Sequence, residues 1–194
     1  ALQNGRLDAA GAVPTGSAVY ELAASNKGIK WLDMPKDNID GWKQLNKLIP
    51  FMKPQKEILG AGLDENNPAY IGGYNYPNLT VYADRSENEV YNFMKAIDES
   101  FNFYKDISAV MFKWKLELSS GTPAEIPIHK GAIKYLKEKN LWSEKDDKWN
   151  NARLRRLEVL IDTWKNFITD NDQLDGEEFK KEWLKVRELA LANN

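Results

Sequence analysis

The residues best suited to chemistry lie at positions 126–138, which hold the only histidine of this 194-residue chain. His129 stands just before Gly131 and Ala132, where a helical pattern of apolar side chains begins. A histidine can act as a general acid or base or bind a metal ion, but it needs partners to do so. The chain has no cysteine and no second histidine. We therefore expect His129 to bind backbone groups at a corner, with Gly131 and Ala132 as structural residues.

A second pattern, near the C-terminus, partly matches a calcium-binding loop. Gly176 and Glu182 match the glycine and the final glutamate of such a loop. However, Asn171 would have to be the first ligand, and Glu178 stands where an apolar residue belongs. A turn that caps a helix is the favoured interpretation, and we expect neither a metal nor a cofactor.

Composition excludes several classes of protein. Charged residues make up 29% of the chain and the formal net charge is -2, so nothing predicts a surface for nucleic acid. No apolar run approaches the roughly eighteen residues that a membrane span needs. The absence of cysteine excludes disulfides and thiol nucleophiles. Because no nucleophile–base pair is visible either, an enzyme is the least favoured class.

We expect no signal peptide in the first residues, because residues 1–5 lack a basic start and an apolar stretch. They are typical of the end of a helix that stops at a glycine. We therefore expect the chain to be a fragment, or a mature piece whose earlier part lies elsewhere.

The first half of the chain is predicted to alternate between strands and helices. Strands are expected at residues 7–13, 29–34 and 79–83, and helices at residues 17–25 and 40–49. Residues 54–77 are rich in Gly, Pro, Asn and Tyr without periodicity. A stretch of this length is typical of a functional loop.

The second half is predicted to be mainly helical. Ser86 and Glu89 match a capping box, and apolar side chains then keep one helical face as far as Tyr104. Further helices are expected at residues 107–118, 129–140, 154–168 and 175–189. The predicted fold class is therefore α/β, with short strands in the first half and helices in the second.

Three segments, in this order, resemble the TAXI subgroup of solute-binding proteins, which serve tripartite (TRAP-type) transporters. The first is the Ala-Leu start with Leu-Asp-Ala at residues 7–9. The second is residues 79–83, which lead into Glu-Val-Tyr at 89–91. The third is Pro-Ile-His-Lys-Gly-Ala at 127–132, followed by Leu-Trp at 141–142. Two residues depart from the family pattern: Lys130 stands where Pro is usual, and Asn140 where Gly is common.

The resemblance covers only the second half of such proteins, and the first lobe would precede Ala1. It implies a partial type II periplasmic-binding-protein fold. Residues 1–78 would be the remainder of the second ligand-binding lobe with its long Gly/Tyr-rich loop. Residues 79–194 would form a crossover strand and the C-terminal helices.

The resemblance also implies a function. Such proteins are non-catalytic, lie in the periplasm and bind a small organic anion, commonly an amino acid or a dicarboxylate, in a cleft between two lobes. The closed form would then dock on a membrane permease. The alternative is an accessory subunit on a degenerate binding-protein scaffold, which would hold another periplasmic protein.

Two segments are candidate ligand contacts under this resemblance. Thr15, Gly16 and Ser17 follow an expected strand and open a helix, where hydroxyls and backbone amides can hold a carboxylate. The alternative is that Thr15 or Ser17 simply caps the helix. Tyr74 and Tyr76 lie in a Gly- and Tyr-containing segment that the family also has, and their rings could close over a ligand. The alternative there is a hinge loop with tyrosines at the surface.

Overall fold

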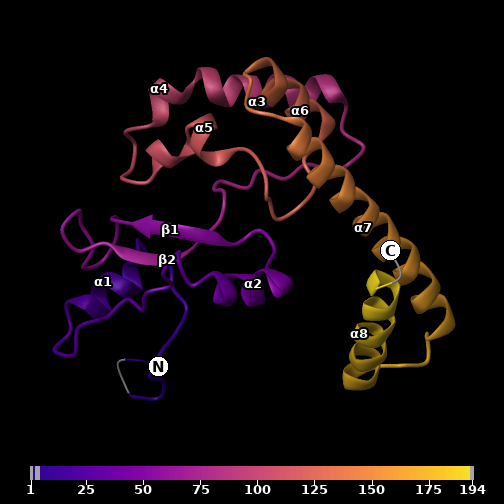
Figure 1. Cartoon of the computed structure of the whole chain (residues 1–194), viewed down its shortest axis with the longest axis horizontal. Coiled ribbons are helices and arrows are strands. Elements are labelled where there is room, and N and C mark those ends of the chain that lie inside the picture. The colour runs from indigo at the N-terminus through magenta and orange to yellow at the C-terminus, as the bar shows by residue number, and fades with distance from the viewer. Residues whose placement is uncertain (1, 3–4, 193–194) are drawn as a thin grey trace. The chain divides into compact units, whose positions relative to one another are not determined.

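The computed structural model describes residues 2 and 5–192, which fall into two compact units. Unit 1 consists of Ala1–Thr80 and Phe93–Glu125, and unit 2 of Val81–Asn92 and Ile126–Asn194. Figure 1 shows their helices and strands. The helix end expected at residues 1–4 lies, apart from Leu2, outside the described residues.

Unit 1 contains a β-hairpin. β1 (Lys53–Glu57) pairs antiparallel with β2 (Ala69–Gly73), and Gln55 lies opposite Ile71. The prediction that residues 54–77 are irregular was therefore wrong. The missed signal is a turn in the connection, where the Asp64 carboxylate accepts hydrogen bonds from two backbone amides within three residues of it.

The three strands expected from apolar runs are irregular segments in the structure. Residues 7–13 are exposed, as are residues 79–83. Residues 29–34 make one sheet-like bond, from the Met34 amide to the Tyr70 carbonyl at 2.6 Å, and no ladder. Small apolar side chains such as those of residues 7–13 bury too little surface to order a strand that has no partner.

The helices of unit 1 are short. The two expected first are confirmed as α1 (Ser17–Ala23) and α2 (Ile39–Leu48), and Trp42 is the buried residue of α2. The later ones are α4 (Phe101–Tyr104), the 3-10 helix η1 (Met111–Trp114) and α5 (Leu116–Ser119). The single helix expected at residues 107–118 is thus replaced by η1 and most of α5.

The long helix α3 (Glu87–Glu99) passes from unit 2 into unit 1. Its start is closed by the expected capping box, because the Ser86 amide donates to the Glu89 carboxylate at 3.1 Å and the Glu89 amide donates back to the Ser86 hydroxyl at 3.2 Å. The hydrogen bonds from Ser86 also lower the pKa of Glu89.

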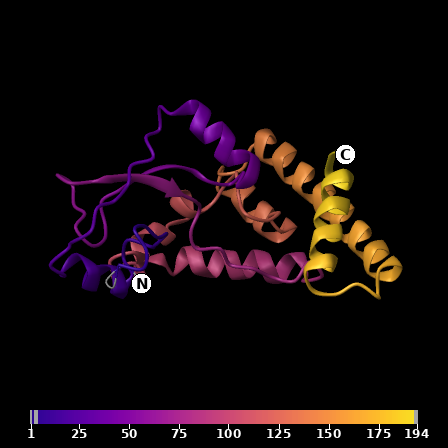
Figure 2. The same ribbon diagram turned by 90° about the horizontal axis from the view of Figure 1, so that it is seen from below.

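Unit 2 is helical apart from its connections. It contains α6 (Lys130–Glu138), α7 (Glu144–Asp170) and α8 (Gly176–Ala192), which confirms a mainly helical second half. Its most deeply buried side chains are Tyr135 and Leu136 of α6. The helices α7 and α8 lie side by side and antiparallel in both views (Figures 1 and 2).

Candidate functional site

The turn before α1, at residues 14–17, is held against the loop that follows β1. The Ala61 amide donates to the Pro14 carbonyl at 3.0 Å. Gly60 has φ +140°, and a Cβ on it would collide with Pro14. Trp31 adds a third segment, since its indole N–H donates to the Ala61 carbonyl at 3.0 Å. Backbone contacts therefore fix this turn without using the side chains of residues 15 and 17.

Thr15 and Ser17 are exposed at the start of α1. Gly16 is the N-cap residue, and no side chain makes the capping hydrogen bond. The helix cap that was the alternative role for Thr15 or Ser17 is therefore not formed. The strand expected before them is also absent, so the turn does not lie at the end of a sheet strand. Of the features predicted for an anion site, the structure keeps the two exposed hydroxyls of Thr15 and Ser17 on a fixed turn.

Tyr74 and Tyr76 flank Asn75, which is only 7% exposed. The Asn75 side-chain amide donates to the Gly121 carbonyl at 2.9 Å, and its oxygen accepts from Lys53 Nζ at 2.6 Å. This segment is consequently anchored to two other parts of unit 1, which argues against a hinge at this point.

The two tyrosine rings are about half exposed, Tyr74 at 45% and Tyr76 at 50%. Tyr74 meets Phe51 edge-on at 6.1 Å between ring centroids, and Tyr76 meets Trp114 in the same way at 6.2 Å. The buried indole N–H of Trp114 has no hydrogen-bond acceptor among the described residues. Because this N–H is buried, it is not presented to the exposed face of Tyr76.

The structure does not assemble the predicted contacts into one site. No hydrogen bond or ring contact within residues 5–192 joins Thr15, Gly16 or Ser17 to Tyr74 or Tyr76. A concave surface lies elsewhere in unit 1, along α2. It is a shallow, open groove of about 620 Å³ with three lysines around an apolar floor: Lys36, Lys43 and Lys47 with Ile39, Trp42, Asn46 and Pro54.

A buried carboxylate joins the hairpin to η1. Glu57 is 6% exposed and accepts hydrogen bonds from Lys113 Nζ and from the amides of Ile58 and Leu59. Burial by itself raises the pKa of Glu57, but the bond from Lys113 and those from the two amides outweigh it, so the pKa is lowered. With its partners supplied by the protein, Glu57 is a structural residue.

In unit 2, His129 is the N-cap residue of α6. Its Nδ1 accepts from the Gly131 amide at 3.1 Å, and its Nε2 lies 3.1 Å from the Arg85 carbonyl. These contacts fit a neutral ring that carries its proton on Nε2. Gly131 and Ala132 are both buried, and a Cβ on Gly131 would collide with the backbone oxygen of Glu87.

The other end of α6 explains one departure from the TAXI pattern. Asn140 has φ +58°, in the left-handed region. The Leu141 amide donates to the Leu136 carbonyl at 2.8 Å and the Asn140 amide to the Lys137 carbonyl at 3.1 Å, which is a Schellman motif. Asparagine tolerates this conformation better than other residues with a side chain, so it can replace glycine.

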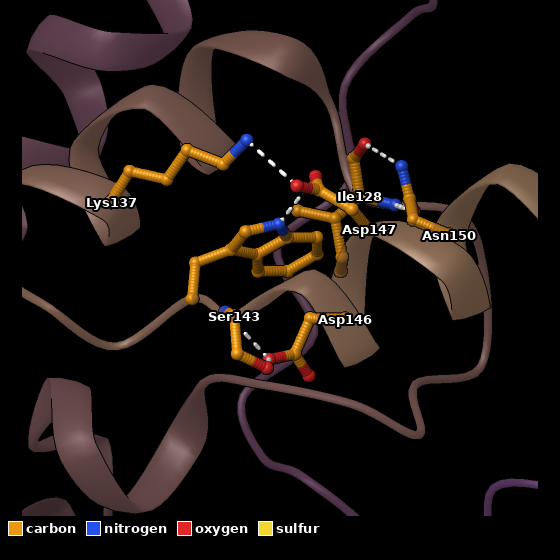
Figure 3. Close-up of polar contacts among 7 residues, drawn as sticks. Ile128, Lys137, Ser143, Asp146, Asp147 and Asn150 are labelled. Carbon is orange, nitrogen blue, oxygen red and sulfur yellow. Dashed lines mark hydrogen bonds and ion pairs between the residues drawn. The ribbon is translucent and has the colours of Figure 1, made fainter.

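Polar side chains at the start of α7 close the corner between α6 and α7 (Figure 3). The Asn150 amide pairs with both backbone groups of Ile128, at 2.7 Å and 3.3 Å. Asp147 accepts from the Trp142 indole at 2.8 Å and from Lys137 at 2.9 Å. Both hydrogen bonds lower the pKa of Asp147, and the bond from Trp142 has the larger effect. The polar side chains at this corner therefore bind groups of the protein itself.

Among residues 2 and 5–192, no group of three or more acidic or histidine side chains could hold a metal ion. No helix there is long and apolar enough to cross a membrane.

Comparison with known proteins identifies the family. The model of the NMT1-like family matches residues 1–139, which is more than half of the chain. Neither a curated protein nor a solved structure matches. NMT1-like domains are generally non-catalytic binding domains. The chain therefore belongs to the NMT1-like family, which is related to periplasmic solute-binding proteins.

Proposed function

We propose that this protein is a TAXI-type solute-binding protein, or part of one, that binds a small organic anion for a TRAP transporter. It would work in the periplasm, without catalysis, and deliver an amino acid or a dicarboxylate to a membrane permease. Membership of the NMT1-like family supports a solute-binding role. The segments at residues 127–132 and 141–142 support the TAXI subgroup.

Unused polar groups in unit 1 carry the proposal for the site. Thr15 and Ser17 leave their hydroxyls exposed on a turn fixed by Pro14. Tyr76 is half exposed and adds a phenol hydroxyl, and its ring is held edge-on against Trp114. These are neutral donors, which suit a carboxylate that must be bound and released.

A thermal-shift screen with acidic amino acids and small dicarboxylates tests the proposal. A bound carboxylate should raise the melting temperature of unit 1, with matched amides and amines as controls. Ser17→Ala and Tyr76→Phe should each reduce the shift. Tyr82→Phe, at a tyrosine that is 79% exposed in unit 2, should leave it unchanged. If no carboxylate stabilises the protein, the transport role fails.

The same screen distinguishes the alternative role. An accessory subunit that holds another periplasmic protein would show no carboxylate-dependent shift, yet would be purified from its source in a larger complex. A shift that survives both Ser17→Ala and Tyr76→Phe would keep solute binding but place it elsewhere, for example in the lysine-lined groove on α2.

A further inference from the structure

The outer part of α7 carries an apolar stripe that the described chain leaves partly exposed. Its members recur at alternating intervals of three and four residues: Leu154 40%, Leu157 41%, Ile161 43%, Trp164 38% and Ile168 42% exposed. This is the spacing of a coiled-coil seam. With a rise of 1.5 Å per residue the stripe is about 21 Å long. We call these five residues the α7 seam.

The neighbouring helix α8 covers only one flank of the seam. Trp164 and Phe167 contact Phe179 and Trp183 of α8 through their rings. Phe167 is 3% exposed, but α8 itself has no buried residue. The aromatic contact between α7 and α8 therefore leaves the other seam residues without a partner helix in the described chain, and amphipathic helices gain most of their stability when such a face is covered.

We propose that two copies of this protein associate through the α7 seam, with the two α7 helices antiparallel about a twofold axis near Ile161. The seam is symmetric about that residue, because its members lie at nearly equal distances on both sides. Across the axis the pairs are Ile161 with Ile161, Leu154 with Ile168, and Leu157 with Trp164. Each copy thus offers the same patch to the other, as a twofold interface requires. With both α8 helices the product is a four-helix bundle.

The charges beside the seam fit this arrangement. Glu158 and Lys165 lie one residue after Leu157 and Trp164, on the flank opposite Phe167. The antiparallel axis brings Glu158 of one copy close to Lys165 of the other, and the pair occurs twice. Lys165 also lies 3.7 Å from Asp162 on its own helix, but those two side chains are 69% and 74% exposed, so that ion pair is weak.

The α7 seam lies in a different part of the chain from the proposed solute-binding residues. The family match ends at residue 139, whereas α7 begins at Glu144. The seam therefore belongs to a part of the chain outside the matched region. Self-association would stand or fall independently of the proposed carboxylate site.

Sedimentation or light scattering of the intact chain over a wide concentration range tests the inference. The unaltered protein should approach the mass of a dimer as concentration rises. Ile161→Glu should raise the dissociation constant by about tenfold or more, because two unpaired carboxylates would meet at the axis. Asn166→Glu, on the side of α7 away from the seam, is the matched control and should leave the dimer intact. Circular dichroism checks that both variants stay helical.

Two further variants test the direction of the helices. Glu158→Lys and Lys165→Glu should each weaken the dimer, and the double variant should restore it. Because the chain has no cysteine, Ile161→Cys should yield a single disulfide-linked dimer on mild oxidation, and Asn166→Cys should not. A monomer at all concentrations, or a dimer that is insensitive to Ile161→Glu, overturns the proposal. Failure of the double variant to restore the dimer overturns the antiparallel axis.

Discussion

The helices α6 and α1 begin in opposite ways. At the start of α6, His129 uses both ring nitrogens on backbone groups, and Gly131 lies against α3. At the start of α1, Gly16 has no side-chain cap, and Thr15 and Ser17 are exposed. The most conspicuous residue of the chain therefore has no ring nitrogen left for a ligand.

The two helices also differ in how many of their residues are buried. The helix α6 buries Gly131, Ala132, Tyr135 and Leu136, whereas α1 buries only Val19. Residues that satisfy one another in a buried corner stabilise the fold, and residues on a lightly packed turn are free to bind other molecules. Four sets of substitutions can break or sharpen this contrast, and they follow in order of expected effect.

Gly131→Ala should have the largest effect. The added Cβ would collide with the Glu87 backbone and force α6 away from α3, at a cost of about 2–3 kcal/mol, although alanine favours helix. Gly16→Ala is the matched change at α1, where the nearest atom to the new Cβ is 3.2 Å away, and it should cost less than about 1 kcal/mol. Urea midpoints measure both, and equal losses would contradict the contrast.

His129→Ala should come next, with a loss of about 1–2 kcal/mol for an N-cap that also bonds to Arg85. His129→Asn keeps an acceptor for the Gly131 amide and should recover part of the loss. Thr15→Ala should change stability by no more than about 0.5 kcal/mol, since its side chain caps nothing. Thermal melts of the three variants provide the comparison. A Thr15 variant as unstable as His129→Ala would show that the hydroxyl is structural after all.

Asn140→Ala tests the far end of α6. Alanine is strained at φ +58°, so the variant should lose about 1 kcal/mol, whereas Asn140→Gly should be nearly neutral. If both substitutions cost the same, the asparagine side chain and not the backbone conformation is what matters. Chemical denaturation of the two variants side by side decides this.

Acid should act on the α6–α7 corner and not on α1. The folded pKa of Asp147 is lowered, so the stability it contributes is present above the unfolded pKa and is lost as pH falls through the folded pKa. Asp147→Asn should therefore flatten part of the acid unfolding curve, followed by tryptophan fluorescence, with a small loss at neutral pH. The first turn of α1 has no acidic residue, so substitutions at Thr15 should leave the curve unchanged.

The sequence predicted α1, α2, α3, α6 and α8 because their apolar spacing is strong, but it started the helix at residues 154–168 too late, since α7 begins at Glu144, and it joined η1 and α5 into one helix. It predicted the backbone contacts of His129 because a lone histidine before Gly-Ala has few other roles. It missed the hairpin, because β1 reads Lys-Pro-Gln-Lys-Glu and has no apolar alternation. It predicted strands at residues 7–13 and 79–83, because a sequence pattern cannot show that a strand lacks a partner.

The buried polar contacts were beyond sequence reasoning for a different reason. Glu57 pairs with Lys113 across 56 positions, and Asn75 bonds to Gly121 across 46. Nothing local marks either residue, because a glutamate or an asparagine in a loop is usually exposed. The free N–H of Trp114 is likewise visible only once the neighbours of Tyr76 are in place.

The two bonds from Asn150 to Ile128 have a consequence for how the chain can be divided. A truncated protein that stops at residue 139, where the family match ends, would lose Asn150 and leave both backbone groups of Ile128 without partners just before α6. One that ends just after residue 150, before Leu154, would keep this corner closed while omitting the α7 seam. The part of unit 2 that closes this corner is therefore longer than the region shared with the family, and it ends inside α7.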